Sequence, residues 1–285
     1  MTLSNSHMAF IHEAVPYLES PSFLMQVANR VGVPLQSLAS MVVPQALAEV
    51  GHKALIKVLS LAADTVTTTS GNVDFDEAHR SSGWSGFFHR VLATLTGGVG
   101  GTFGLAGLAI ELPLTTSIMF RSITSIANDF GENLRAPEVR LECLTVFSHG
   151  GPSQYDDALD STYIRTRIAM AQLVQEAADF MTRQSAKAIS DAIARGSAPI
   201  LIQFINRVAA RFNLAVSQKF VAQSLPLIGA VTGAAINNAF TGHFNSVARY
   251  HFGIRKLERQ YGEELVRAAY RRQLEILRNS NRLGG

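Results

Sequence analysis

Cysteine is nearly absent from this chain of 285 residues: Cys143 stands alone, which excludes an internal disulfide framework. Histidine occurs eight times but never as HExxH, because His12-Glu13 is followed by Ala-Val-Pro, so we expect no metal site. No basic segment followed by an apolar run opens the sequence, in which Arg30 is the first basic residue. We therefore expect no cleaved signal peptide, and a location in the cytoplasm at the inner face of the cell membrane.

Charged residues are also scarce. They make up 16% of the chain, against about 25% in typical soluble domains. The net charge of +3 is too small to indicate a nucleic-acid partner, and we expect none. A mean hydropathy of +0.14 is intermediate, well short of a multi-span transporter. Few charges leave less hydrated surface, which favours burial of part of the chain against lipid or a partner.

The sequence motifs of common nucleotide-binding enzymes and hydrolases are missing. No lysine occurs between Lys57 and Lys187, which excludes a Walker A loop in the glycine-rich region. The run Gly98-Val-Gly100-Gly-Thr-Phe103 lacks the third glycine of GxGxxG, and Gly83-Trp-Ser85-Gly86 is one residue short of GxSxG. The sequence therefore predicts no cofactor.

Two long apolar segments are the most informative feature that is present. Residues 91–120 carry Glu111 as their only charge, and residues 220–248 contain no Asp, Glu, Lys or Arg. A helix of about 20 apolar residues is long enough to cross a hydrocarbon core. Six glycines lie between Gly97 and Gly107, and each costs a water-exposed helix about 1 kcal/mol relative to alanine. Close backbone packing or a non-helical turn is needed to offset that cost.

Small residues recur four apart in both segments, at Gly97/Gly101, Gly100/Gly104 and Gly229/Gly233. This spacing lets two helix backbones meet closely, in membranes and in the cores of soluble bundles. Core packing is favoured for Gly229/Gly233, whereas a hairpin, a re-entrant segment or a mobile insert competes with a core helix at residues 97–107. The residues that we expect in membrane or apolar contacts are Gly97, Gly101, Phe103, Gly104, Leu105 and Leu108.

No strand-like alternation of useful length occurs, so we predict a single all-α domain over residues 1–285, built around the two apolar segments. Proline and glycine mark the expected helix boundaries, with a break at Glu111-Leu-Pro113 and a loop at 72–86. The expected helices cover residues 46–69, 114–130, 137–150 and 156–195, a stretch from Pro199, and a basic C-terminal helix at 255–282.

Polar side chains within or beside the apolar segments form the candidate site. They are Glu111, Arg121, Asn237, His243, His251 and Arg255. Guanidinium groups match the oxygens of a phosphate or carboxylate headgroup, and the carboxylate and imidazoles could perform acid–base chemistry if their pKa values are shifted. The alternative is a set of buried ion pairs and caps that fix helix packing.

The C-terminal part of the chain is basic, since residues 250–285 carry eight Arg or Lys against four Glu. An anionic membrane attracts such a helix by about 1 kcal/mol per basic side chain near the headgroups. A solvated helix with pairs such as Glu263–Arg267 is the alternative.

Four stretches together resemble the EcsC family, which is named for the third protein of a bacterial ABC-transporter operon. They read GGVGGTFGLAGLAIELPLTTSIMFRSITSIANDFGENL, ECLTVFSHGG, STYIRTR and LPLIGAVTGAAINNAFTGHFNSVARYHFGIRKLERQYG, and the resemblance covers roughly residues 30–275. It implies a helical protein linked to membranes and to transport, and it brings no established catalytic residues. The six candidate site residues named above match the recurrent polar motifs of the family.

These observations predict a peripheral or monotopic membrane protein that binds lipid or an apolar ligand. Residues 91–120 and 199–205 would supply apolar contacts, and Arg267, Arg271 and Arg272 would add charge. One alternative is an enzyme that acts on a lipid or other apolar substrate, with Glu111 or His243 as the acid–base group. Another is a docking module for a membrane transporter.

Overall fold

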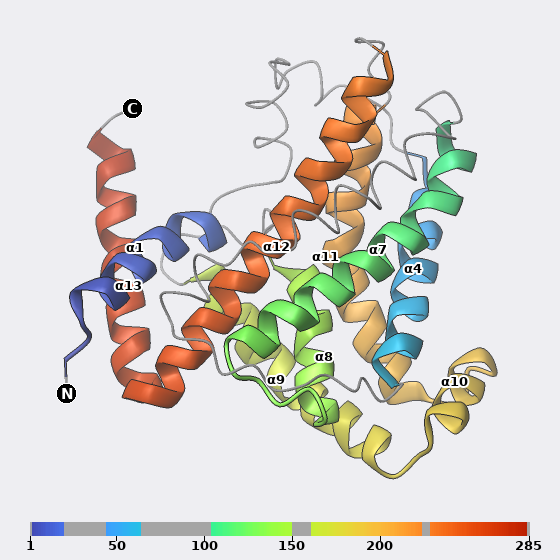
Figure 1. Cartoon of the computed structure of the whole chain (residues 1–285), viewed down its shortest axis with the longest axis horizontal. Helices are drawn as coiled ribbons and strands as arrows, with labels where there is room; N and C mark the ends of the chain where they lie inside the picture. The colour runs from blue at the N-terminus through green and yellow to red at the C-terminus, as the bar shows by residue number, and fades with distance from the viewer. Residues whose placement is uncertain (1, 20–43, 64–103, 150–160, 224–228, 284–285) are drawn as a thin grey trace.

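The computed structural model describes residues 2–19, 44–63, 104–149, 161–223 and 229–283 (Figure 1). Within these ranges every regular element is a helix and no strand occurs, so the all-α prediction is confirmed. The predictions for the loop at 72–86 and for Gly97, Gly101 and Phe103 lie outside the described residues.

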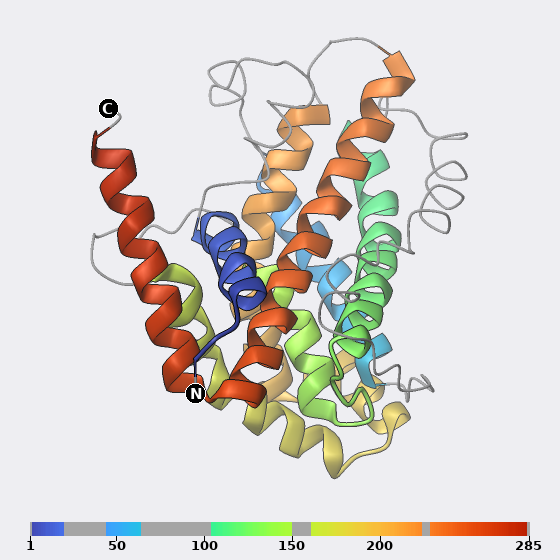
Figure 2. The ribbon, with the colours of Figure 1, turned by 60° about the vertical axis from the view of Figure 1, so that its left-hand side comes forward.

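Helices α4, α7, α11 and α12 run through the body of the molecule, the others pack around them, and α1 lies beside α13 at one side (Figures 1 and 2). The elements are α1 (Asn5–Glu19), α4 (Ala46–Ala63), α7 (Gly104–Asp129), α8 (Pro137–Thr145), the 3-10 turn η1 (Val146–Ser148), α9 (Thr162–Thr182), α10 (Ala186–Ala194), α11 (Pro199–Gln223), α12 (Gly229–Tyr261) and α13 (Glu263–Leu283). The three longest are α7, α11 and α12, and α4 packs against α7 and α11.

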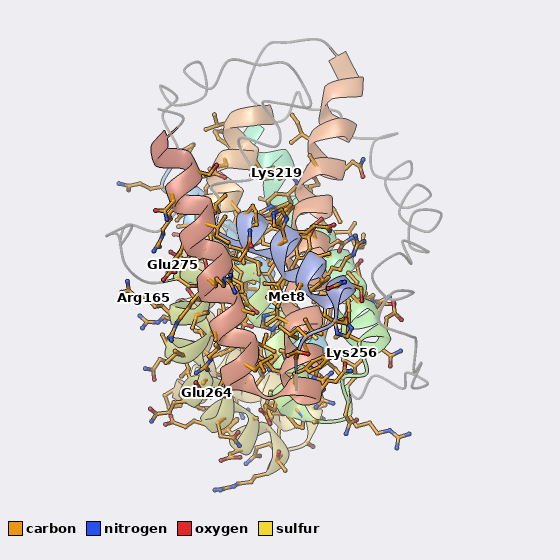
Figure 3. All side chains as sticks on the ribbon, turned by 90° about the vertical axis from the view of Figure 1, so that its left-hand side faces the viewer. Met8, Arg165, Lys219, Lys256, Glu264 and Glu275 are labelled. Atoms are coloured by element: carbon orange, nitrogen blue, oxygen red, sulfur yellow. The ribbon has the colours of Figure 1, made fainter. Side chains whose placement is uncertain are left out.

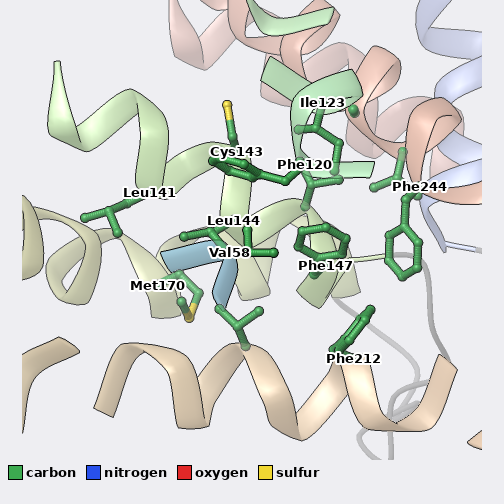
Figure 4. Close-up of a cluster of buried hydrophobic side chains, with 14 of the residues drawn as sticks. Val58, Phe120, Ile123, Leu141, Cys143, Leu144, Phe147, Met170, Phe212 and Phe244 are labelled. Carbon is green, nitrogen blue, oxygen red and sulfur yellow. The ribbon is translucent and has the colours of Figure 1, made fainter. Parts of the chain in front are cut away.

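Buried apolar side chains from all of these helices form one continuous core, part of which is shown in Figure 4. Phe147 of η1 stands at a junction, with ring centroids 5.2 Å from Phe212 of α11 and 5.1 Å from Phe244 of α12. Tilted and edge-on pairs at this separation are favourable for aromatic rings. Full burial of each such side chain contributes about 1.5–3 kcal/mol, so this junction holds α11 and α12 together.

Helix α7 passes through Pro113 without a break, and the predicted end at Glu111-Leu-Pro113 is wrong. Proline removes one helix hydrogen bond, which frees the carbonyl of Ala109, but Ala109 is exposed to water. The next turn is reinforced by Thr116, whose hydroxyl donates to the Leu112 carbonyl at 2.7 Å. Because α7 is continuous, Glu111 and Arg121 lie about 15 Å apart along one axis and cannot pair across a turn.

Two other predicted helices are each divided. The predicted helix at 156–195 ends in the structure at Thr182, and Ser185 then caps α10 by accepting from the Ala188 amide at 3.2 Å. The predicted basic helix at 255–282 is divided at Gly262, whose φ of +88° is a conformation that favours glycine. Because the amphipathic pattern continues on both sides of each turn, the pattern alone did not indicate where the turns lie.

Helix α1 was not predicted, although its apolar residues repeat at helical spacing. Phe10, Ala14 and Leu18 are buried, and the Phe10 ring lies so close to Gly253 of α12 that a Cβ there would be 2.2 Å from its Cζ. The glycine therefore sets how closely α1 approaches α12.

The apolar start of α11 faces the core. Leu201, Phe204 and Ile205 are all at most 1% exposed. These three side chains pack against the neighbouring helices, whereas Pro199 is exposed and Ile200 and Ile202 are partly buried, so membrane contact by residues 199–205 stays a prediction for those positions.

Candidate functional site

The six predicted site residues do not form one cluster. Asn237 and Arg255 lie on the same helix, separated by 18 residues or about 27 Å along its axis. His251 and Arg255 are one turn apart and do come together. The remaining four side chains have other surroundings.

Glu111 pairs with a lysine that sequence reasoning did not select. The Lys219 Nζ of α11 donates to the Glu111 carboxylate at 2.7 Å and lies 5.0 Å from the centroid of the Phe240 ring of α12. Lys219 is fully buried, whereas Glu111 is 23% exposed. Burial lowers the pKa of Lys219 and Glu111 opposes that effect. The pair therefore joins α7, α11 and α12 rather than leaving a carboxylate available as an acid–base group.

The other three residues lie in unlike environments. His243 is buried against α1, where its Nδ1 is 3.4 Å from the Tyr17 hydroxyl. Asn237 is 6% exposed, and its Oδ1 accepts no hydrogen bond in the part of the chain that the structure describes. Arg121 is exposed on α7.

A second set of polar side chains lies where α8, α9 and α12 meet, together with the turn that follows α7. We call this set the polar centre. It consists of Glu132, Glu142, His149, Tyr163, Arg167, His251, Arg255, Glu258 and Arg259.

His251 stands at the middle of the polar centre. Its Nδ1 is 3.1 Å from the Tyr163 hydroxyl, and its Nε2 is 3.5 Å from a Glu142 carboxylate oxygen, a polar contact without hydrogen-bond geometry that is an ion pair only when the imidazole is protonated. The ring of His149 stacks on that of His251 with centroids 5.3 Å apart. Both imidazoles are almost fully buried, and the His149 Nε2 makes no hydrogen bond among the described residues.

Arginine–glutamate pairs surround the two histidines. Arg167 and Glu258 form two hydrogen bonds of 2.8 Å, the fork geometry that guanidinium and carboxylate groups favour. Arg255 donates from Nε to Glu132 at 2.9 Å and also lies 3.5 Å from Glu142. Arg259 pairs with Glu132 and donates to the Phe130 carbonyl at 2.9 Å. Three carboxylates thus balance three guanidinium groups.

The environment favours charged carboxylates and neutral imidazoles. Burial alone would raise the pKa of Glu142, but His251, Arg255 and Arg167 outweigh it and lower that pKa to about 2. Burial lowers the pKa of His251, with Glu142 opposing, and burial with the neighbouring His251 lowers the pKa of His149 well below its usual range. The polar centre therefore links helices at neutral pH without an exposed acid–base group.

Sequence reasoning selected two members of the polar centre, His251 and Arg255. It missed Glu142, His149 and Tyr163, although the quoted stretches ECLTVFSHGG and STYIRTR contain them. Neither stretch has a spacing that predicts its partners, because Tyr163 and His251 are 88 residues apart in the chain.

The start of α7 presents a different surface. Leu108, predicted as an apolar contact, is 2% exposed and belongs to the core, whereas Ile110 is 79% and Leu114 is 42% exposed. At 100° per residue, Ile110, Leu114 and Arg121 point within about 40° of one another. These three exposed residues make up what we call the outer face of α7. For Gly104 and Leu105 only their place in α7 is described.

A model of the EcsC protein family matches residues 19–257. The chain belongs to the EcsC protein family. Neither a curated protein nor a solved structure matches it. The EcsC match contains the outer face of α7 and all of the polar centre except Glu258 and Arg259, whereas α13 and nearly all of α1 lie beyond its ends.

Among the described residues, no group of three or more His, Cys, Asp or Glu side chains could hold a metal ion. None of the helices described is both long and apolar enough to cross a membrane.

Proposed function

We propose that this EcsC protein attaches peripherally to an anionic membrane surface through the outer face of α7. The observation that carries the proposal is the exposure of Ile110, the last residue of a stretch without charge (residues 91–110), and of Leu114 one turn further along α7. Single exposed apolar side chains are ordinary, but two on one helix face at the end of a long apolar stretch favour an apolar partner.

The position of Arg121 fits a membrane surface. It lies on the same face as Leu114 and about 10 Å further along the axis, since seven residues separate them. With α7 lying along the surface and Ile110 and Leu114 at the acyl boundary, the long Arg121 side chain extends from the same face toward the phosphates, as arginine side chains at interfaces do.

The free energy of binding expected from these contacts corresponds to reversible attachment. Burial of an exposed isoleucine or leucine contributes up to about 1.5–3 kcal/mol, and one basic side chain near anionic headgroups adds about 1 kcal/mol. A total of a few kcal/mol gives binding that depends on both lipid charge and salt.

Co-flotation with vesicles tests the proposal. We expect the protein to float with vesicles that contain phosphatidylglycerol and less with phosphatidylcholine alone. Leu114→Asp should abolish flotation. Met8→Asp is the matched control, because Met8 on α1 is 37% exposed, close to the 42% of Leu114, and lies far from the apolar stretch in the sequence (Figure 3).

Two outcomes would contradict membrane attachment. An equal loss of flotation in Leu114→Asp and Met8→Asp would mean that flotation responds to any added negative charge and not to the outer face of α7. An absence of flotation in the unmodified protein would leave the outer face of α7 as a surface for a protein partner such as a transporter. Glu111 as an acid–base group is the less favoured alternative, because its carboxylate is paired with Lys219.

A further inference from the structure

Three arginines on one side of the molecule have no carboxylate partner among the residues that the structure describes. Arg165 lies on α9, and Arg207 and Arg211 lie on α11, which packs against α9. Arg165 and Arg207 are exposed and Arg211 is partly buried (Figure 3 shows Arg165 at the edge of the molecule). No carboxylate of the described chain lies within ion-pair distance of any of the three, in contrast to Arg167, Arg255, Arg259 and Arg267.

The three positive charges are close enough to repel one another. Arg207 and Arg211 are one helical turn apart, where side chains on the same face are neighbours. Burial lowers the pKa of Arg211, and the charges of Arg207 and Arg165 lower that pKa further. Helix α11 contains no Asp or Glu, and α9 has none before Glu176, so neither helix offers a nearby carboxylate.

We propose that Arg165, Arg207 and Arg211, which we call the arginine cluster, bind the oxyanion of a phosphate group. Guanidinium forks match phosphate oxygens bidentately, and a phosphate monoester carries more negative charge than a single carboxylate. Binding would remove the mutual repulsion of three cations that the fold holds together. This site is on α9 and α11, away from the outer face of α7, and it does not depend on the proposed membrane attachment.

Exposed apolar side chains lie beside the arginine cluster on both helices. Ile168 follows Arg165 by three residues and is 55% exposed, and Leu214 follows Arg211 by three residues and is 43% exposed. Residues three apart share a helix face. The surface therefore offers apolar contact next to the charge, which suits a phosphate that carries an acyl or other apolar group, while the cluster itself also suits a soluble phosphate.

Thermal unfolding in phosphate and in chloride at equal ionic strength and pH tests the site. We expect inorganic phosphate to raise the Tm by about 2–4 °C more than chloride once it exceeds its Kd several-fold. Arg165→Gln and Arg207→Gln alter exposed side chains, so both variants should fold. Each should lose the additional rise in Tm that phosphate gives. Arg195→Gln is the control, because Arg195 is an exposed arginine at the end of α10 and should keep the gain. Leu114→Asp should also keep it.

A second arm separates the sources of phosphate. The same variants are tested for binding to vesicles that contain phosphatidic acid. Loss of the phosphate gain in Arg165→Gln and Arg207→Gln supports a site for soluble phosphates, and a selective loss of vesicle binding in these variants supports a lipid headgroup. The proposal is overturned if the unmodified protein responds to neither probe, or if these variants respond as strongly as Arg195→Gln.

Discussion

At the scale of the residue, the fold depends on a few charges that are kept out of water. Lys219 is fully buried and its ammonium has the Glu111 carboxylate 2.7 Å away. A buried pair of this kind contributes little net stability over an apolar pair of similar size, but removal of one partner leaves an uncompensated charge. The chain thus tolerates the pair only as long as both members are present.

Substitution of Glu111 tests this reasoning. Glu111→Gln should lower the free energy of unfolding by about 3–5 kcal/mol, because the Lys219 ammonium loses its counter-charge. The double variant Glu111→Gln/Lys219→Met should be more stable than Glu111→Gln alone, since no buried charge remains. Urea denaturation measures both values. A double variant less stable than the single one would contradict this reasoning, because it would show that Lys219 stabilises the fold without its counter-charge, as through its contact with the Phe240 ring.

The buried histidines predict how stability depends on pH. The pKa of His149 and that of His251 are lower in the folded protein than in the unfolded chain, where they are about 6.5. The unfolded state therefore binds more protons as pH falls below about 6.5, and folding stability is lost in that range. For Glu142, with a folded pKa of about 2, the loss begins only as pH falls below the unfolded value of 4.5.

Denaturant midpoints at about pH 7 and pH 5 measure this effect, which should be on the order of 1 kcal/mol or more for a fully buried imidazole. His149→Gln should reduce the loss of stability between the two pH values. His12→Gln, which alters an exposed side chain on α1, should not. An unchanged pH dependence in His149→Gln would contradict the account.

At the scale of the element, α1 is held in place by two contacts. The Phe10 ring packs against Gly253 of α12, and the Glu19 carboxylate lies at the N-terminus of α9. Glu19 accepts hydrogen bonds from the Thr162 amide and the Tyr270 hydroxyl, both at 2.9 Å, and so binds the N-terminus of α9 and one side of α13. A negative charge is favourable there because the first amides of a helix lack partners.

The contact of Phe10 with Gly253 gives a prediction for this element. Gly253→Ala places a methyl group into the Phe10 ring and should displace α1, at a cost of about 1–3 kcal/mol. Amide hydrogen exchange of residues 5–19 should become faster in this variant. Addition of Phe10→Ala to Gly253→Ala should restore part of the lost stability, because the space is then available. Unchanged exchange in Gly253→Ala would refute the close approach.

At the scale of the whole molecule, the sequence predicted the helical class and the family but not the contacts between distant elements. The absence of strand periodicity was sufficient to predict the helical class, and the motifs around Glu111 and His251 were sufficient to predict the family. Helix α7 continues through Pro113 because the Ala109 carbonyl, which loses its hydrogen bond there, is exposed to water. Glu142 acts through its contact with His251 of α12, more than a hundred residues away in the chain. Local patterns carry no information on such tertiary contacts.

The central claim is that the outer face of α7 enters a membrane surface. A polarity-sensitive fluorophore on Leu114→Cys tests it directly, because the native Cys143 is buried and burial raises its pKa well above the usual range, so that labelling falls on the new thiol. The same label on Met8→Cys is the control. We predict a blue shift on addition of vesicles that contain phosphatidylglycerol for Leu114→Cys and none for Met8→Cys. No shift at either position, or the same shift at both, would contradict the account.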